Sequence, residues 1–445
     1  MSVGAARLRE EPDVIRKGAV DKGEDPSLVD AALVVDEERR QLQAKVDTLR
    51  AERNRVSERV GEAIRRGAHS EGPEVAALRS QSSWIGAELA GLEGRLAAIQ
   101  ARLDEALLRI PNPPDPDIPV GGEEASLVIR SWGEPGSHAE PAAEGHAAWE
   151  RRPHWEVGES LGMLDLAAGA KVAGSGFPLY RGAGAALQRA LIDFFLDLHV
   201  REHGMTEVWP PAMVNAASAR GTGQLPDKED QMYVVTRDEL YLVPTAEVPV
   251  TNIHRDEIIE AERLPIRYVA YSPCFRREAG AAGARTRGIL RVHQFDKVEM
   301  VSFTRPEDSS AELEWLTERA ESLLQRLGLT YRVVLMATRE MGFVQARKYD
   351  LEVWAPGVER WLEVSSVSNF RDYQARRMAI RYRPRPGDHP ELVHTLNGSG
   401  LALPRTVAAI LETYQQTDGS VAIPTVLRPA FGGRDRFAQV STARA

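Results

Sequence analysis

Apolar residues in the N-terminal part of the chain recur at steps of three and four on both sides of one break. After charged, weakly patterned residues 1–26, a helical pattern starts at Ser27, with apolar positions Leu42, Val46, Leu49, Val56, Val60 and Ile64. Residues 67–73 interrupt it, and it resumes at Val75, Leu78, Ile85, Leu89, Leu92, Leu96, Ile99 and Leu103, ending at Ile110. This spacing predicts two helices zipped as an antiparallel coiled coil, the arm, over about residues 27–110. At ~1.5 Å per residue, the arm reaches on the order of 55 Å and must project from any compact core.

A proline-rich segment ends this pattern. Ile110 is followed by Pro111-Asn112-Pro113-Pro114-Asp115-Pro116-Asp117-Ile118-Pro119, a composition typical of a stiff linker between domains. We therefore divide the chain into an N-terminal domain (1–112), a linker (113–120), a second domain (121–433) and a tail (434–445) that we expect to be disordered.

The second domain interleaves many strand-like segments with a few helical ones. We expect helices at 184–201, 307–327 and 401–414, strands at 206–211 and 239–243, and hairpins at 275–301 and 349–364. Because neighbouring strands are mostly joined by hairpins, this order predicts an antiparallel sheet flanked by helices. The expected fold class is α+β.

Composition limits the class of protein and the cellular location that we expect. Of 445 residues, 43% are hydrophobic and 27% charged, as in ordinary globular proteins, and the net charge of -9 argues against a uniformly basic nucleic-acid coat. The N-terminus lacks the apolar core of a signal peptide, and no uncharged apolar run approaches the ~18 residues of a membrane span. The single cysteine, Cys274, excludes a cysteine-based zinc cluster, and we expect no zinc. We expect a soluble, cytoplasmic protein without a membrane partner.

The first helix of the arm is locally basic. Between residues 39 and 66 it carries nine basic residues against four acidic ones: Arg39, Arg40, Lys45, Arg50, Arg53, Arg55, Arg59, Arg65 and Arg66. A cationic stripe on a projecting hairpin suits a phosphate backbone. A solvated helix face with many salt bridges explains the same charges, and the stripe alone does not decide between them.

The hairpin at 275–301 carries an unusual polar set. Period-2 alternation places Arg291, His293, Phe295, Lys297 and Glu299 on one face, so that an aromatic ring, cations and a carboxylate lie side by side. An ordinary surface strand could also carry this set.

Three further segments combine polar residues in ways that suit chemistry. In Thr245-Ala246-Glu247, a hydroxyl and a carboxylate could hold an ammonium group, although a helix N-cap is an equal reading. Glu363-Val364-Ser365-Ser366 offers oxygen ligands of the kind that Mg²⁺ takes beside phosphates and water. Asn397-Gly398-Ser399-Gly400 is expected to open a helix that carries Arg405, a suitable site for an anion.

Three common motifs are absent. The chain has no Gly-x-x-x-x-Gly-Lys-Ser/Thr loop, no Gly-x-Gly-x-x-Gly after a first strand and no His-Glu-x-x-His. The usual P-loop, dinucleotide and zincin chemistries are therefore not expected.

Taken together, these segments make the chain similar to the bacterial seryl-tRNA synthetases, a class II aminoacyl-tRNA synthetase family, over essentially its full length. Residues 206–211 resemble motif 1, with Pro211 as the motif proline; Phe275-Arg276-Arg277-Glu278 through Phe295 to Glu299 resemble motif 2, and residues 398–405 motif 3. Gly221-Thr222-Gly223-Gln224-Leu225-Pro226, Thr245-Ala246-Glu247, Asn397-Gly398-Ser399 and the arm resemble the serine-specific marks.

The resemblance implies a serine–tRNA ligase that uses ATP and Mg²⁺. It implies that Arg276 and Arg405 are catalytic, with Arg276 between the serine carboxylate and the α-phosphate and Arg405 at the γ-phosphate. It implies serine binding by Thr245, Ala246, Glu247, Arg276, Glu299, Asn397 and Ser399. It implies ATP binding by Arg276, Arg277, Glu278, Val292, Phe295, Glu363, Val364, Ser365, Ser366 and Arg405, with Glu363 and Ser366 as Mg²⁺ ligands.

The resemblance also implies partners. The family acts as homodimers on tRNA-Ser, and on selenocysteine tRNA where the host has one. Two rivals stay open: a paralogue that passes serine to another acceptor, and a non-catalytic RNA-binding protein that uses the arm alone. The length of the arm argues against the first rival, and the joint presence of Arg276, Glu299, Glu363 and Arg405 argues against the second.

Three positions depart from the family pattern. The motif 2 loop reads Gly283-Ala284-Arg285-Thr286-Arg287-Gly288, without its usual acidic residue, and Gly176 stands where arginine is common. Val367 replaces a frequent cysteine, a change of packing only.

For the arm, we predict that replacing Arg50, Arg53 and Arg55 together with alanine weakens tRNA binding and flattens its salt dependence, because fewer counterions are released on binding. Formation of the adenylate should hardly change. Filter binding at several salt concentrations, beside pyrophosphate exchange, tests this division; an equal loss in both assays would contradict it.

Overall fold

The computed structural model describes residues 3–135, 150–279 and 287–438, and it divides the chain into two compact units, Met1–Pro111 and Asn112–Ala445. This division lies next to the predicted boundary at residue 112. The double proline and the loss of the heptad spacing are the sequence features behind it.

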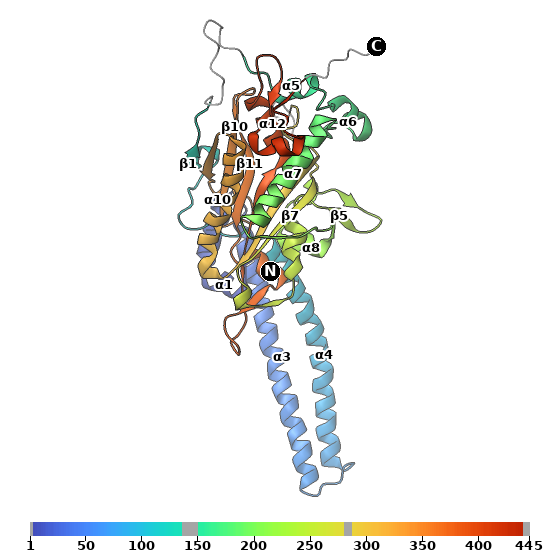
Figure 1. Ribbon diagram of the computed structural model, residues 1–445. Coiled ribbons are helices and arrows are strands. Elements are labelled where there is room, and N and C mark those ends of the chain that lie inside the picture. The colour runs from blue at the N-terminus through green and yellow to red at the C-terminus, as the bar shows by residue number, and fades with distance from the viewer. Residues whose placement is uncertain (1–2, 136–149, 280–286, 439–445) are drawn as a thin grey trace. The chain divides into compact units, whose positions relative to one another are not determined.

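The first unit is helical. It consists of α1 (Ala5–Glu10), α2 (Pro12–Lys22), α3 (Ser27–Arg65) and α4 (Pro73–Leu108). Figure 1 shows α3 and α4 as two long helices, running side by side in opposite directions. The residues buried between them include Val46, Val56, Ile85 and Leu89, all on the predicted seam. The antiparallel pair is therefore confirmed.

Two short helices in this unit were not predicted. Leu8 of α1 and Ile15 of α2 are fully buried and pack with Val29, Leu103 and Leu107 at the base of the arm. Each of these short helices buries only a few apolar residues, so the helical period cannot be recognised in residues 1–26.

The second unit is built on one eight-stranded sheet, antiparallel except for its last pair. Its strand order is β1 (Leu127–Trp132), β9 (Tyr331–Leu335), β10 (Arg347–Ala355), β11 (Arg360–Asn369), β14 (His394–Ala402), β8 (Gln294–Thr304), β7 (Ile266–Phe275) and β2 (Thr206–Glu207). The α+β prediction is confirmed.

Three long helices cover the sheet: α7 (Ala183–Arg201), α10 (Ser309–Leu327) and α12 (Leu403–Thr413). Glu312 of α10 accepts hydrogen bonds from Arg267 and Ser302, which point to one face of β7 and β8. Side chains three residues apart on a strand point to opposite faces, so Glu299 points away from α10.

The remaining elements are short. The helices are α5 (His154–Ser160), α6 (Leu166–Ala173), α8 (Ala216–Thr222), α9 (Glu247–Thr251) and α11 (Tyr373–Met378). The small sheets are β3 (Met213–Asn215), β5 (Leu240–Leu242) and β4 (Val234–Val235); β13 (Glu391–Leu392), β12 (Arg381–Arg383) and β6 (Ile258–Glu260); and β15 (Val421–Ala422) with β16 (Arg436–Phe437).

The structure corrects three predictions of local structure. Residues 397–400 do not open a helix: they lie in β14, where residues 397–399 pair with β8, and the helix begins only at Leu403. Strand β8 starts at Gln294, so Arg291 and His293 precede the polar face to which they were assigned. Phe437, in β16, is buried and packs against Phe431, so residues 434–438 of the expected tail are ordered. Residues 439–445 lie outside the described residues.

The predicted linker is packed onto the second unit. The backbone N–H of Asn112 donates to the Phe343 carbonyl at 3.0 Å, and its side-chain amide donates to the carbonyls of Val344 and Phe370, both at 2.9 Å. Asp115 accepts hydrogen bonds from Arg347 and Arg371. Among the described residues, no helix combines the length and the apolar character that crossing a bilayer requires.

Candidate active site

A cavity of about 520 Å³ opens on the face of the sheet that points away from α10. Its walls come from β8, β10, β11 and β14, from residues 224–232 and 340–345, and from the start of α12. Most of the residues named by the sequence analysis line it: Thr245, Glu247, Arg276, Glu278, Val292, Phe295, Glu299, Glu363, Val364, Ser366, Asn397, Ser399 and Arg405.

Strand β8 supplies the floor of the cavity through alternation. Phe295, Lys297 and Glu299 all line it, as the period-2 pattern predicted. Arg276, just beyond the end of β7, lies with its guanidinium carbon 5.1 Å from the centre of the Phe295 ring. Its Nε donates to the Pro244 carbonyl at 3.4 Å, and its backbone N–H donates to the His293 carbonyl at 2.9 Å.

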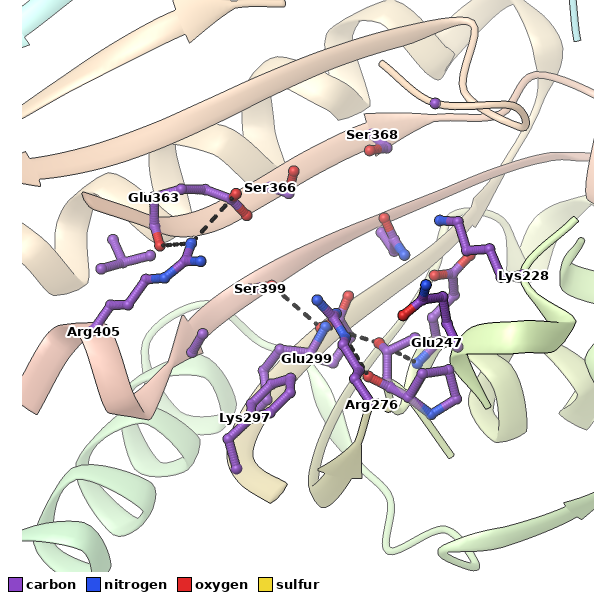
Figure 2. Close-up of a pocket in the computed structure, with 18 of the residues that line it drawn as sticks. Lys228, Glu247, Arg276, Lys297, Glu299, Glu363, Ser366, Ser368, Ser399 and Arg405 are labelled. Atoms are coloured by element: carbon purple, nitrogen blue, oxygen red, sulfur yellow. Dashed lines mark hydrogen bonds and ion pairs between the residues drawn. The ribbon is translucent and has the colours of Figure 1, made fainter. Parts of the chain in front are cut away.

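One end of the cavity gathers buried acidic and hydroxyl groups. Lys297 forms an ion pair with Glu299 and donates to Thr245 Oγ1 at 2.8 Å. Ser399 donates to Glu299 Oε2 at 3.4 Å. Glu247 accepts a hydrogen bond from Gln374 Nε2 at 2.6 Å. Figure 2 shows Glu247 and Glu299 near Arg276 at this end.

Glu247 is held at an electrostatic cost. Burial, followed by the negative charge of Glu299, raises the pKa of Glu247 to about 7, while the hydrogen bond from Gln374 acts in the opposite direction. A carboxylate that is deprived of water in this way favours a cationic partner. The chemistry of this end therefore fits an ammonium group.

The other end of the cavity carries Arg405 and Glu363. Arg405 donates to the carbonyls of Leu290 at 3.0 Å and Glu363 at 2.9 Å, and its guanidinium lies 3.5 Å from Glu363 Oε2. Burial works to raise the pKa of Glu363, but the positive charges of Arg405, Lys348 and Arg276 outweigh it, so the pKa lies below its usual value. Glu363 is therefore an ionised acceptor at neutral pH.

Ser366 and Glu363 were predicted to bind a metal. Both residues line the cavity, and the Ser366 hydroxyl donates to Asp350. Within the described residues, no cluster of three or more His, Cys, Asp or Glu side chains could hold a metal ion. One carboxylate and one hydroxyl oxygen fit an ion that takes its remaining ligands from phosphates and water, as Mg²⁺ does.

Three predicted contact residues do not line the cavity. Ala246 is fully buried, and the Arg277 guanidinium donates to the Asp230 carbonyl at 3.1 Å. The Ser365 hydroxyl donates to the Ser399 carbonyl and ties β11 to β14. The three arm arginines belong to the other unit, where Arg50 pairs with Glu93 and Arg53 and Arg55 are exposed.

Several polar residues at the cavity had no predicted role. Lys348 lines it and pairs with Asp350 at 3.1 Å; burial raises the pKa of Asp350, although Lys348 opposes the shift. The alternation of Lys348 and Asp350 on a strand could have indicated this pair. Gln374 carries no such signal, because it reaches Glu247 from α11, distant in sequence.

The two departures near motif 2 have different outcomes. Gly176 has a φ of +84°, and a Cβ there would lie 2.3 Å from Cδ2 of His293, so a larger residue would require this ring to move. Ala284 and Arg285 lie outside the described residues. Val367 is buried in the sheet core, as a packing change requires.

Comparison with known proteins gives matches over both units. The family model of the tRNA synthetase class II core domain (G, H, P, S and T) matches residues 233–414, and that of the seryl-tRNA synthetase N-terminal domain matches residues 5–114. The serine–tRNA ligase of Thermomicrobium roseum is 51% identical over 431 residues, which cover 97% of this chain and 93% of that protein. The serine–tRNA ligase of Geobacillus kaustophilus is 48% identical over 96% of this chain and 98% of that protein.

A search of solved structures also finds a seryl-tRNA synthetase. The crystal structure of seryl-tRNA synthetase from Pyrococcus horikoshii, complexed with ATP, matches with a TM-score of 0.89 and 38% identity over 99% of this chain and 100% of that one. Giardia lamblia prolyl-tRNA synthetase, at 12% identity, 63% and 57% coverage and a TM-score of 0.54, shares the fold alone.

The raised pKa of Glu247 predicts a pH-dependent gain in stability for Glu247→Gln. The folded-state pKa of about 7 exceeds the ordinary value of 4.5, so the stabilisation from a protonated Glu247 is complete below about pH 4.5 and is lost as pH rises through 7. At pH 8 the buried charge costs up to about 3 kcal/mol. We expect Glu247→Gln to raise the unfolding midpoint at pH 8 by about 3 °C or more and to leave it nearly unchanged at pH 5.

The exposed Glu262→Gln is the matched control, because it removes the same charge without removing a buried one. Thermal unfolding followed by circular dichroism gives both midpoints. A loss of stability at pH 8 would show that the Glu247 charge supports the fold.

Proposed function

We propose a division of labour within the cavity of this chain, which belongs to the seryl-tRNA synthetase family and is a serine–tRNA ligase. It activates L-serine with ATP to seryl-adenylate and pyrophosphate, and transfers serine to the 3′ end of its tRNA. The observation that carries the proposal is that Arg276 lies in the same cavity as the buried acids of one end and the Arg405–Glu363 pair of the other. Serine occupies the first end and the triphosphate the second.

Thr245 and Glu247 take the ammonium group of serine, on the segment that includes Ala246. Glu247 suits this role because a buried, otherwise costly carboxylate gains most from a cationic ligand. Glu299, Ser399 and Asn397 bind the side-chain hydroxyl of serine through hydrogen bonds. Alanine is then rejected, because it would leave these buried polar groups without a partner.

Phe295 stacks on the adenine ring, and Val292 and Val364 contribute apolar contacts to the nucleotide. Glu278 completes the ATP contacts at the mouth of the cavity. Arg277 and Ser365, which do not line the cavity, support the site through their hydrogen bonds to the carbonyls of Asp230 and Ser399. Arg405 takes the γ-phosphate, since its guanidinium is fixed by two carbonyls and faces the cavity. Two cations and one aromatic face match the charge and shape of ATP.

Glu363 and Ser366 would hold the Mg²⁺ that accompanies ATP. When bound, the ion neutralises part of the phosphate charge. Asp350 and Lys348 keep the Ser366 hydroxyl turned so that its lone pairs are free for a ligand.

Arg276 aligns the adenylation step. One carboxylate oxygen of serine forms a bond to the α-phosphorus as the bond to the bridging oxygen breaks, and pyrophosphate leaves with that electron pair. Because both reactants are anionic, a guanidinium between them offsets their repulsion and fixes the in-line approach. The attacking carboxylate is already ionised, so no general base is required. The His293 ring donates from Nδ1 to the Arg276 carbonyl and holds the turn.

Arg276→Ala is expected to lower kcat for serine-dependent pyrophosphate exchange by about 10²–10³-fold, because a charge aligned with the transition state is lost. Arg263→Ala, which removes an exposed arginine outside the cavity, is the control. Exchange is measured with serine, alanine and threonine, followed by charging of tRNA-Ser. Exchange without charging would point to a different serine acceptor, and equal rates with alanine would overturn the assignment of Glu299 and Ser399.

The arm binds the tRNA through Arg50, Arg53 and Arg55, and selenocysteine tRNA is a further substrate in a host that has one. We place the dimer contact at motif 1, where Trp209 is 75% exposed beside the edge strand β2. A large apolar side chain so exposed next to an unpaired strand edge fits a protein interface.

Trp209→Glu is expected to shift the protein from dimer to monomer, because it puts a charge at the centre of this interface. Sedimentation velocity measures the shift, with the exposed Trp84→Glu of the arm as a control. A monomeric wild-type protein would contradict the proposal.

A further inference from the structure

His154 lies fully buried at the start of α5, between α12 and the segment that returns from the motif 2 loop. Its Nδ1 lies 2.7 Å from Glu412 Oε1, and its Nε2 lies 3.2 Å from the backbone nitrogen of Ile289. Neither His154 nor Glu412 lines the cavity. Both are 0% exposed, so their contacts are made with the protein alone.

The two contacts define the protonation state of the ring. The Ile289 N–H can only donate, so Nε2 must carry a lone pair, and the ring proton must lie on Nδ1, which donates to Glu412. Glu412 in turn accepts from the backbone N–H groups of His154, Gly357 and Val358. A buried carboxylate with four donors is fully satisfied as an anion. It therefore holds His154 in one orientation.

These contacts close a ring that includes the ATP end of the cavity. Helix α12 carries Arg405 near its start and Glu412 near its end. Glu412 fixes His154, His154 fixes the N–H of Ile289, and the carbonyl of the next residue, Leu290, accepts from Arg405 Nε. The same helix thus positions both the cation and the backbone that orients the cation.

The neighbouring residues are shaped to permit this ring. Gly288 has a φ of +74°, and a Cβ there would lie 2.3 Å from His154 Nε2, so only glycine lets the backbone come this close. Arg287 lies 4.8 Å above the Trp155 ring, a cation–π contact that holds the segment a second time.

We propose that His154, oriented by Glu412, is a positioning residue for ATP: it fixes residues 288–290 so that Leu290 aims Arg405 at the triphosphate. The proposal rests on the proposed function through the role of Arg405. It concerns ATP alone, because the hydrogen bonds of the ring lead to Arg405 and include none to Thr245, Glu247 or Glu299. The side chains of Thr245, Glu247 and Glu299 keep their own partners.

Two substitutions separate the contacts of His154. In His154→Gln the amide oxygen replaces Nε2 and keeps the acceptor for Ile289; in His154→Asn the amide nitrogen replaces Nδ1 and keeps only the donor to Glu412. We expect His154→Asn to raise the KM for ATP in pyrophosphate exchange about tenfold, the loss of one hydrogen bond's worth of positioning. His154→Gln should stay within about threefold of wild type, and the KM for serine should change less than twofold in both.

Glu412→Gln reaches the same contact from the other side. Its amide offers one acceptor oxygen in place of two, so the four N–H groups around Glu412 can no longer all be paired and His154 is held less firmly. We expect the KM for ATP to rise, as in His154→Asn. This variant keeps the test open if His154→Asn does not fold. The exposed His389→Asn serves as the control and should behave as wild type.

Calorimetric titration of the full-length proteins with ATP gives a second measure, independent of turnover. Wild-type-like affinity in both His154→Asn and Glu412→Gln would overturn the proposal, as would a parallel loss of serine and ATP affinity, which marks a general structural role. Absence of serine-dependent exchange in the wild type would instead contradict the proposed function, so the two failures are distinguishable.

Discussion

The alternation of side chains along β8 determines which of its residues enter the core of the second unit and which line its cavity. On one side of the strand, Ser302 contacts α10 and Val298 and Met300 enter the core. On the other side, Phe295, Lys297 and Glu299 line the cavity. A slip of one residue would move a lysine and a glutamate into the core and the apolar residues into the cavity. The register with β7 and β14 is therefore both a folding requirement and the source of the site's geometry.

Glu247, buried near Glu299 of this strand, works against stability when it is charged. The negative charge of Glu299 adds to burial in raising the pKa of Glu247, and Lys297 forms an ion pair with Glu299. A ligand that brings an ammonium group relieves the remaining imbalance. The end of the cavity that holds Glu247 and Glu299 is thus electrostatically unfavourable until a cationic group enters it, as sites that bind charged groups often are.

Much of this could be predicted from the sequence because the relevant signals are local. The coiled coil shows as a sustained spacing, and the floor of the cavity shows as alternation at Phe295, Lys297 and Glu299. What could not be predicted depends on tertiary pairing. Asn397 and Ser399 look like a helix start because glycine and serine favour caps, but pairing with β8 overrides that preference. Gln374 and the His154–Glu412 pair come together from positions far apart in the chain, and no periodicity connects them.

The packing of Asn112 has a consequence for where the catalytic unit begins. Its backbone and side chain supply the donors for the carbonyls of Phe343, Val344 and Phe370, and Asp115 supplies one for Ala346. Val344 lines the cavity, and Phe343 and Ala346 are adjacent in sequence to residues that line it. A chain cut at residue 121 would lose these four hydrogen bonds, each worth about 1 kcal/mol, and the Phe370 carbonyl would keep the bond from the Tyr373 N–H. The proline-rich segment is thus part of the catalytic unit, which begins at Asn112.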